Sequence, residues 1–178
     1  MQMRFIYLST KIEGYETKEN AINSFKDYLR ESDDKFHISE GKIDISKFDE
    51  GEDIFFLHPQ RVFGYYTYKI VAYCRAGSGI KKTADNSGGL FPYYFKINSD
   101  SLKIFVDGID VKYIQNFIND SNNDISKNVN IVGAVKNNGN GFNGSSSWVY
   151  FDKQDSTKIM KWFRAVSLEE NIQVLCNI

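Results

Sequence analysis

The stretch EGEDIFFLHPQRVFGYYTYKIVAYCRAG runs from Glu50 to Gly77 and carries the strongest structural pattern in the chain. It begins acidic, becomes apolar, breaks at HPQR, and resumes with four tyrosines in nine residues. Two apolar and aromatic runs around a proline-containing break are typical of a β-hairpin. We therefore predict two strands, DIFFLH and RVFGYYTYKIVAYCR, with Pro59 in the turn between them.

The second strand of this hairpin alternates between two faces. One face includes Lys69 and leads to Arg75, so we predict that the opposite face packs into the core. That core face comprises Val62, Gly64, Tyr66, Tyr68, Ile70 and Ala72.

The segments before the hairpin suggest a strand and a helix. RFIYL reads as an opening strand, and Thr17 is a plausible N-cap for a helix over 18–31, whose apolar residues recur with helical spacing. Residues 32–53 are acidic and irregular, with a small strand expected near Ile43.

The segments after the hairpin alternate strands with short helices. We expect strands at LFPYYFKI, LKIFV, NIVGAV and WVYF, a helix capped by Asp110, a second helix capped by Asp155, and a final short strand within IQVLCNI. The predicted class is α+β: a mixed, mostly antiparallel sheet curled into a barrel, with a few short helices around it.

Composition and charge restrict the class of protein further. The 178 residues suit one domain, and no apolar run approaches the roughly 18 residues of a membrane span. The two cysteines form no CxxC motif, so we expect a reducing, cytoplasmic setting.

The net charge is −1, but residues 13–53 hold 13 acidic and 6 basic residues, whereas 61–103 hold 7 basic and 2 acidic residues. This asymmetry predicts one acidic and one basic face, unless the charges interleave in space.

The sequence contains no recognisable catalytic or metal-binding motif. The chain has two histidines but no GxSxG motif, and no Cys or His has zinc-ligand spacing. AGSGIKK lacks the spacing of a nucleotide-binding loop, although its glycines and lysines could contact a phosphate. We therefore expect no catalytic residues, no metal and no cofactor.

Aromatic residues are unusually frequent, at 15% of the chain. Tyrosines in a sheet are often core residues, and we expect this of Tyr66, Tyr68, Phe91, Tyr93 and Phe95. Tyr65, Tyr94, Trp148 and Tyr150 have polar neighbours that are hard to bury with them. Trp148 follows a Gly- and Ser-rich stretch, where an indole could stack on a flat base or belong to the core.

The order of segments resembles the PUA-like superfamily, and within it the EVE and YTH-like domains. The matching positions are Gly51 with Asp53, His58, Phe63-Gly64-Tyr65, Phe91-Pro92-Tyr93, and the closing WVYF strand with the helix over 155–164. This resemblance implies a small PUA-like β-barrel with peripheral helices, spanning 1–178 as one domain with an acidic helical insertion at about 14–50.

The resemblance also implies a function. EVE and YTH-like domains hold a modified base, flipped out of its strand, in an aromatic pocket, and similar domains stand at the N-terminus of McrB-type modification-dependent restriction proteins. By this resemblance the chain is a noncatalytic reader of a modified base, in DNA more than RNA, with a restriction NTPase or nuclease as a partner or fused domain. The implied pocket comprises Ser9, Thr10, His58, Tyr65, Tyr94 and Trp148, and the implied phosphate contacts are Arg75, Lys81 and Lys82.

Two other classes of function remain open from the sequence. One is an ASCH-like enzyme acting on nucleosides or RNA, with Lys69 or Lys96 and Asp53 as its acid–base residues. The other is a protein-interaction domain that uses the acidic helical insertion.

Overall fold

The computed structural model describes residues 2–7, 18–38, 48–62, 65–83, 92–126, 131, 148–169 and 174–175. The strands are β1 (Met3–Tyr7), β2 (Lys35–Ile38), β3 (Asp53–Val62), β4 (Tyr65–Ala76), β5 (Lys81–Lys82), β6 (Tyr93–Asp110), β7 (Trp148–Phe151) and β8 (Val174–Leu175). The helices are α1 (Lys18–Glu31), α2 (Val111–Asn119), the short 3₁₀ helix η3 (Ser121–Asn123) and α4 (Lys153–Glu169).

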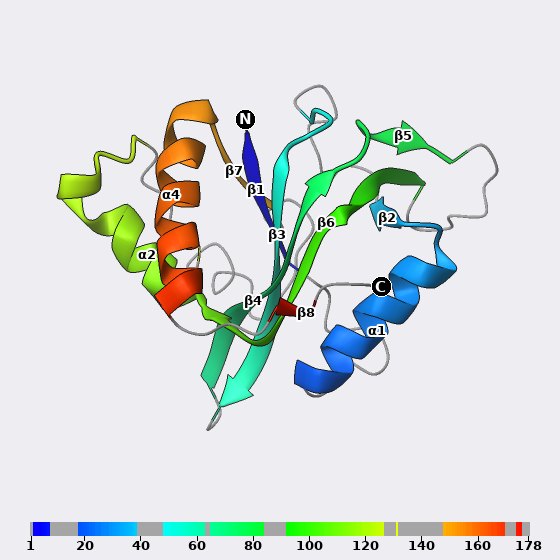
Figure 1. Ribbon diagram of the computed structural model, residues 1–178, viewed down its shortest axis with the longest axis horizontal. Coiled ribbons are helices and arrows are strands. Elements are labelled where there is room, and N and C mark those ends of the chain that lie inside the picture. Colours follow the sequence, from blue (N-terminus) through cyan, green and yellow to red (C-terminus); the bar gives the residue numbers. More distant parts are fainter. Residues whose placement is uncertain are drawn as a thin grey trace.

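The strands form one curled sheet in the order β2-β6-β4-β3-β1-β7, with β5 and β8 paired to β6 (Figure 1). Among the described pairings only β1 with β3 is parallel. The prediction of a mixed, mostly antiparallel α+β fold is therefore confirmed. The terminal strands β2 and β7 are not paired with each other in the part of the chain that the structure describes.

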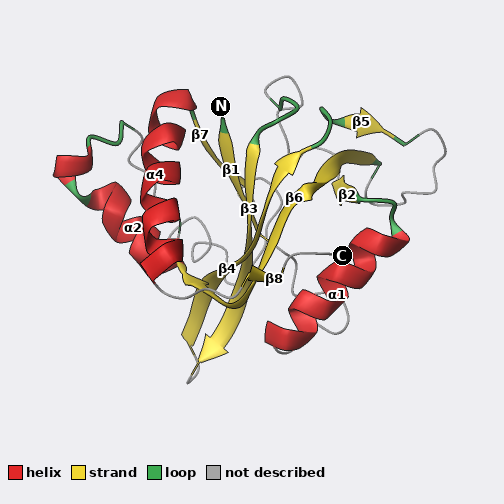
Figure 2. Ribbon diagram, in the orientation of Figure 1, coloured by secondary structure: helices red, strands yellow, loops and turns green. Residues whose placement is uncertain are grey.

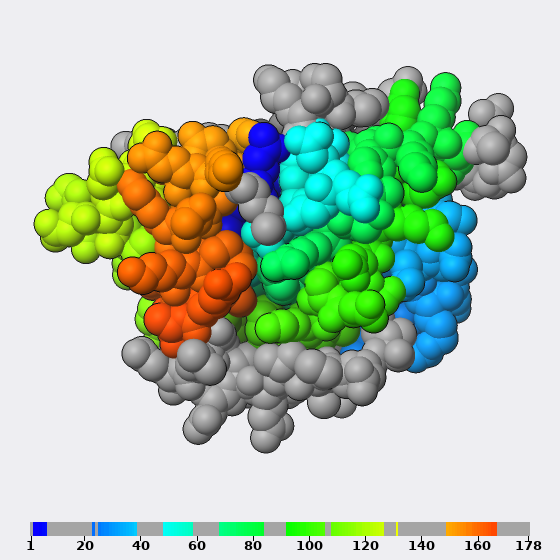
Figure 3. Space-filling model, turned by 45° about the horizontal axis from the view of Figure 1, so that its top comes forward, coloured from blue at the N-terminus to red at the C-terminus, as the bar shows by residue number. Residues whose placement is uncertain are grey.

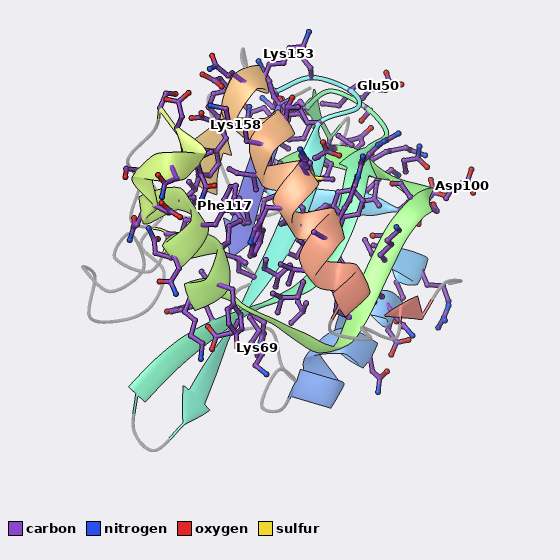
Figure 4. The ribbon with its side chains drawn as sticks, turned by 60° about the vertical axis from the view of Figure 1, so that its left-hand side comes forward. Glu50, Lys69, Asp100, Phe117, Lys153 and Lys158 are labelled. Atoms are coloured by element: carbon purple, nitrogen blue, oxygen red, sulfur yellow. The ribbon has the colours of Figure 1, made fainter. Side chains whose placement is uncertain are left out.

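Helices cover both faces of this sheet, with α2 and α4 on one side and α1 on the other (Figure 2). On the side of α2 and α4, Phe5, Phe55 and Phe105 pack with Ile114 and Phe163. Phe117 on α2 also lies beside α4 (Figure 4), where its ring stacks on that of Trp162 at 5.5 Å. The side of α1 has a core of its own, which includes Phe25, Leu29, Phe56, Cys74, Phe95 and Ile104.

The central hairpin exists, but Pro59 does not lie in its turn. β3 continues through Pro59 to Val62, and β4 begins at Tyr65. β1 pairs with β3 only as far as Leu57. Beyond that residue one edge of β3 has no strand beside it among the described residues, so a proline without an N–H is tolerated there.

The predicted single core face of β4 is also wrong, because helices cover the sheet on both sides. Tyr68 and Ile70 pack toward α2 and α4, as does Tyr73, whereas Ala72 and Cys74 pack toward α1. A bulge between residues 70 and 72 shifts the alternation and turns Ala72 to the face opposite Ile70.

Outside the hairpin, several local predictions are confirmed. The helix over 18–31 is α1, the strand WVYF is β7, and Asp110 caps α2 by accepting a hydrogen bond from the Lys112 N–H at 2.9 Å. LFPYYFKI and LKIFV do not form two strands, because the described part of both belongs to the single strand β6. The strand expected near Ile43 lies outside the described residues, as does NIVGAV apart from Ile131.

Asp155 does not cap the last helix, because α4 begins at Lys153. The Asp155 N–H donates instead to Oδ1 of Asp152 at 3.0 Å, so Asp152 is the capping residue. The buried Asp155 carboxylate accepts hydrogen bonds from the Ser126 N–H at 2.9 Å and its hydroxyl at 2.8 Å. Asp155 therefore anchors the segment after η3 to α4.

Candidate nucleic-acid interface

Strands β2, β6 and β5 present a polar face beyond the helix-covered part of the sheet. In register, His37 on β2 and Lys81 on β5 lie on either side of Tyr94 on β6. Lys35 and Lys96 face each other in the next row. Residues that pair directly across antiparallel strands project to the same face, so these five side chains share one surface.

The opposite side of the same strands is core, which fixes the orientation of this surface. Phe95 and Ile97 are buried in the α1 core and Tyr93 packs against it, as the predicted alternation of this strand requires. Tyr94 and Lys96 therefore project to the face that α2 and α4 cover elsewhere. In Figure 3 the green surface of β5 and of the start of β6 lies at the opposite end of the view from the orange α4. We call this surface the open face.

The open face combines an aromatic ring with several cations. The Tyr94 ring is half-buried, with the His37 ring centroid at 5.8 Å and Nζ of Lys35 at 5.6 Å from its own centroid. Nζ of Lys96 lies 3.1 Å from the Asp33 carboxylate, and Nζ of Lys35 lies 3.9 Å from it. A flat ring bordered by ammonium groups is suited to a planar, anionic ligand.

Arg75 extends the open face onto β4, because it pairs with Asn98 of β6. Its Nε lies 3.8 Å from the buried carboxylate of Asp53, while its side chain remains 44% exposed. The same carboxylate accepts a 2.6 Å hydrogen bond from the Tyr73 hydroxyl. Burial, and then the neighbouring Asp53, raise the pKa of Tyr73 well above its ordinary value of 10.0. Asp53 is thus held between a neutral phenol and a partly exposed guanidinium.

The two lysines proposed as phosphate contacts do not act from one side. Lys81 pairs with Tyr94 and lies on the open face, whereas Lys82 pairs with Tyr93 and lies on the opposite face. Both are exposed. Of the three implied phosphate contacts, Arg75 and Lys81 therefore share the open face, and Lys82 does not.

The implied base pocket is not gathered in one place among the described residues. Ser9 and Thr10 lie outside those residues. His58 is only 2% exposed and follows Leu57 on β3, so it lies on the α1 side of the sheet, opposite to Tyr94. Tyr65 starts β4 at the hairpin end, and Trp148 starts β7, which is separated from β6 by the three strands β4, β3 and β1. Tyr94 is thus the one implied pocket residue whose side chain the structure describes on the open face.

Sequence reasoning missed the contribution of β2. His37 and Lys35 lie in a segment that was expected to be irregular, and they reach the open face because β2 pairs with β6. The signal was the short alternation KFHI, in which Phe36 and Ile38 face the α1 core while the other two residues face outward. The acidic and basic segments of the chain therefore interleave here rather than form separate faces.

The described residues contain no group of three or more His, Cys, Asp or Glu side chains placed to hold a metal ion. Of the alternative acid–base residues, Lys96 contacts Asp33, whereas Asp53 contacts Tyr73 and Arg75. Lys69 pairs with His58, five residues along β3 from Asp53. None of the described helices is both long enough and apolar enough to span a bilayer.

Comparison of the chain with models of known protein families gives no match, and comparison with curated protein sequences gives none either. Its function must therefore be argued from the chemistry and geometry of the open face.

Proposed function

We propose that this chain is a noncatalytic nucleic-acid binding module that binds through the open face of β2, β6 and β5. The observation that carries this proposal is the half-exposed ring of Tyr94, which has Lys35, Lys81 and Lys96 around it on three adjacent strands. Sheets that bind single-stranded nucleic acid combine the same two elements, an aromatic ring on which a base stacks and cations that contact the backbone.

The proposed ligand has at least one base outside a duplex stack. A base exposes its π-face to a protein ring only when it is single-stranded or flipped out. We retain the flipped, modified base of the PUA-like resemblance as the finer form of this proposal, with DNA favoured over RNA and a restriction NTPase or nuclease as partner. Tyr94 is the stacking residue in either form.

The first test is direct binding. Fluorescence anisotropy with single-stranded and duplex DNA and RNA, carrying unmodified or modified cytosine and adenine, is measured at two salt concentrations. We expect binding that favours unpaired bases and weakens with salt, because lysines that contact phosphates release counterions. Preference for a modified base over its unmodified counterpart supports the finer form. An affinity that is the same for every base favours the single-strand form.

Two matched pairs of variants locate the interface. Tyr94→Leu removes the ring and is expected to weaken binding about five- to 150-fold, as loss of one stacked base does, whereas Tyr94→Phe keeps the ring and the affinity. Lys81→Ala removes a cation from the open face, and Lys82→Ala removes the same charge from the opposite face of the same two-residue strand. We expect a lower affinity and a flatter salt dependence for Lys81→Ala but not for Lys82→Ala.

The proposal fails if the folded protein binds none of these nucleic acids at low salt, and the protein-interaction hypothesis is then favoured. Equal effects of Lys81→Ala and Lys82→Ala would contradict the choice of surface but not the binding activity.

A further inference from the structure

Asp33 lies beside two lysines of the open face. Its carboxylate lies 3.1 Å from Nζ of Lys96 and 3.9 Å from Nζ of Lys35, and its side chain is 77% exposed. Two lysines on adjacent strands therefore converge on one anion that remains open to solvent.

The turn that carries Asp33 is held by contacts other than the Asp33 carboxylate. Asp33 and Asp34 both have left-handed backbones, with φ of 54° and 58°, which aspartate and asparagine adopt more readily than most residues. The Asp34 N–H donates to the Leu29 carbonyl at 3.0 Å, and the Ile97 N–H of β6 donates to the Asp34 carbonyl at 2.8 Å. The backbone thus presents the carboxylate of Asp33 at a fixed point of the open face.

The position of this carboxylate matches the chemistry of a nucleic-acid phosphate. A carboxylate and a phosphodiester each carry a negative charge on oxygen atoms that accept hydrogen bonds from ammonium groups. Lys35 contacts the Asp33 carboxylate and also lies 5.6 Å from the centre of the Tyr94 ring. An anion between the two lysines therefore lies beside the stacking ring, as a backbone phosphate lies beside its own base.

We propose that Lys35 and Lys96 form a phosphate subsite of the interface, and that Asp33 is a built-in competitor that fills this subsite when nucleic acid is absent. This inference rests on the proposed function and adds to it a residue that limits affinity. A backbone phosphate that enters the subsite displaces the carboxylate, and the contacts that the lysines make with Asp33 are lost in exchange.

The charge state of Asp33 is consistent with this role. Lys96 donates a hydrogen bond to the carboxylate and, with Lys35, attracts it electrostatically, which lowers the pKa of Asp33 below its ordinary value of 3.8. The competitor is therefore an anion at neutral pH.

The test compares Asp33→Asn with Asp34→Asn, using a fluorescent single-stranded oligothymidylate and the full chain. Both changes remove one negative charge from the same turn and keep a residue that tolerates a left-handed backbone. Asp34 is a matched control because its carboxylate accepts a hydrogen bond from the Ser99 hydroxyl at 2.5 Å rather than contacts from the two lysines. We expect Asp33→Asn to tighten binding about two- to fivefold at low salt and to steepen the salt dependence, with a smaller gain for Asp34→Asn.

The same comparison in a protein that lacks Lys96 shows whether the gain in affinity depends on the subsite. In a protein that already carries Lys96→Met, Asp33→Asn should tighten binding no more than Asp34→Asn tightens binding of the unchanged protein. One of the two lysines that the Asp33 carboxylate contacts is already absent there. Equal effects of Asp33→Asn and Asp34→Asn in an otherwise unchanged protein that binds would overturn the competitor but leave the proposed function intact. Absence of binding in the unchanged protein and in both variants would overturn the proposed function, and this inference with it.

Discussion

Two ionic clusters in this protein have similar chemistry and opposite surroundings. Arg4 on β1 pairs with Glu52 in a forked contact, with Nε–Oε2 at 2.5 Å and Nη2–Oε1 at 3.3 Å, and the side chains are only 5% and 2% exposed. Lys96 pairs with Asp33 at 3.1 Å, but those side chains are 44% and 77% exposed. Exposure separates an ion pair that maintains the fold from one that a ligand can replace.

The environment of each pair explains the difference. The Arg4 guanidinium lies over the rings of Phe48 and Tyr150, with its carbon 5.1 and 4.9 Å from their centroids, so little water reaches it. Loss of one buried partner leaves an uncompensated charge in a medium that solvates it poorly. Water replaces a lost partner at the open face, so exchange of Asp33 for another anion costs little.

The largest expected effect is on the buried pair. Arg4→Met is expected to lower the free energy of unfolding by about 3–5 kcal/mol, because Glu52 remains buried without its cation. Urea denaturation measures this change. Arg30→Met is the matched control, since its pair with Asp27 on α1 has side chains that are 65% and 62% exposed, and about 0–1 kcal/mol is expected there. Similar losses of unfolding free energy in the two variants would contradict the distinction between buried and exposed ion pairs.

An intermediate effect is expected where the buried and exposed regions meet. Tyr73→Phe removes the hydroxyl that donates to Asp53, which should lower the free energy of unfolding by about 1.5–3 kcal/mol at neutral pH. Urea denaturation again provides the measurement. A loss below about 0.5 kcal/mol would mean that Arg75 alone satisfies Asp53.

The stability contributed by Tyr73 should also depend on pH in the alkaline range. Because the pKa of Tyr73 is raised in the folded state, the unfolded chain releases the phenolic proton first as the pH rises. The stability linked to this proton is fully present below the ordinary pKa of 10.0 and is lost as the pH rises above it. Denaturation between neutral pH and pH values above 10 should therefore show a shallower decline in Tyr73→Phe than in the unchanged protein. Part of the decline should persist, since burial also raises the pKa of Tyr28.

The smallest effect on stability is expected at the open face. Asp33→Asn should leave the urea midpoint at neutral pH unchanged, because water solvates Lys35 and Lys96 in place of the carboxylate. Since the pKa of Asp33 is lowered, any stability that it adds is present above pH 3.8 and disappears as the pH falls through the lowered pKa. A clear loss of stability at neutral pH would show that the Asp33 contacts maintain the fold, as the buried Arg4–Glu52 pair does. It would contradict the proposal that a ligand phosphate can replace the Asp33 carboxylate.

Local signals in the sequence predicted local structure well. The periodicity of 18–31 predicted α1, and Asp110 was recognised as the cap of α2, because both depend on neighbouring residues alone. The prediction that Asp155 caps α4 was wrong by three positions, because Asp152 also carries a carboxylate suited to a helix start.

The misses involve contacts between distant parts of the chain. Pro59 is acceptable within β3 because, among the described residues, β1 pairs with β3 only as far as Leu57, and Ala72 faces α1 because of a bulge opposite β6. The open face depends on the pairing of β2 with β6, which joins residues about 60 positions apart. No local pattern encodes such pairings, so the site could be predicted only in part, through Tyr94, Arg75 and Lys81.

The place of β1 between β3 and β7 has a consequence for folding during synthesis. β3 and β4 are adjacent in sequence and can pair as soon as both leave the ribosome, but β1 needs β3 on one edge and β7 on the other. With Trp148 about 140 residues behind its partner Ile6, translation at 5–20 residues per second separates the two by on the order of ten seconds. We therefore expect the docking of β7 to be a late event, with Phe5 and Ile6 exposed to chaperones until then.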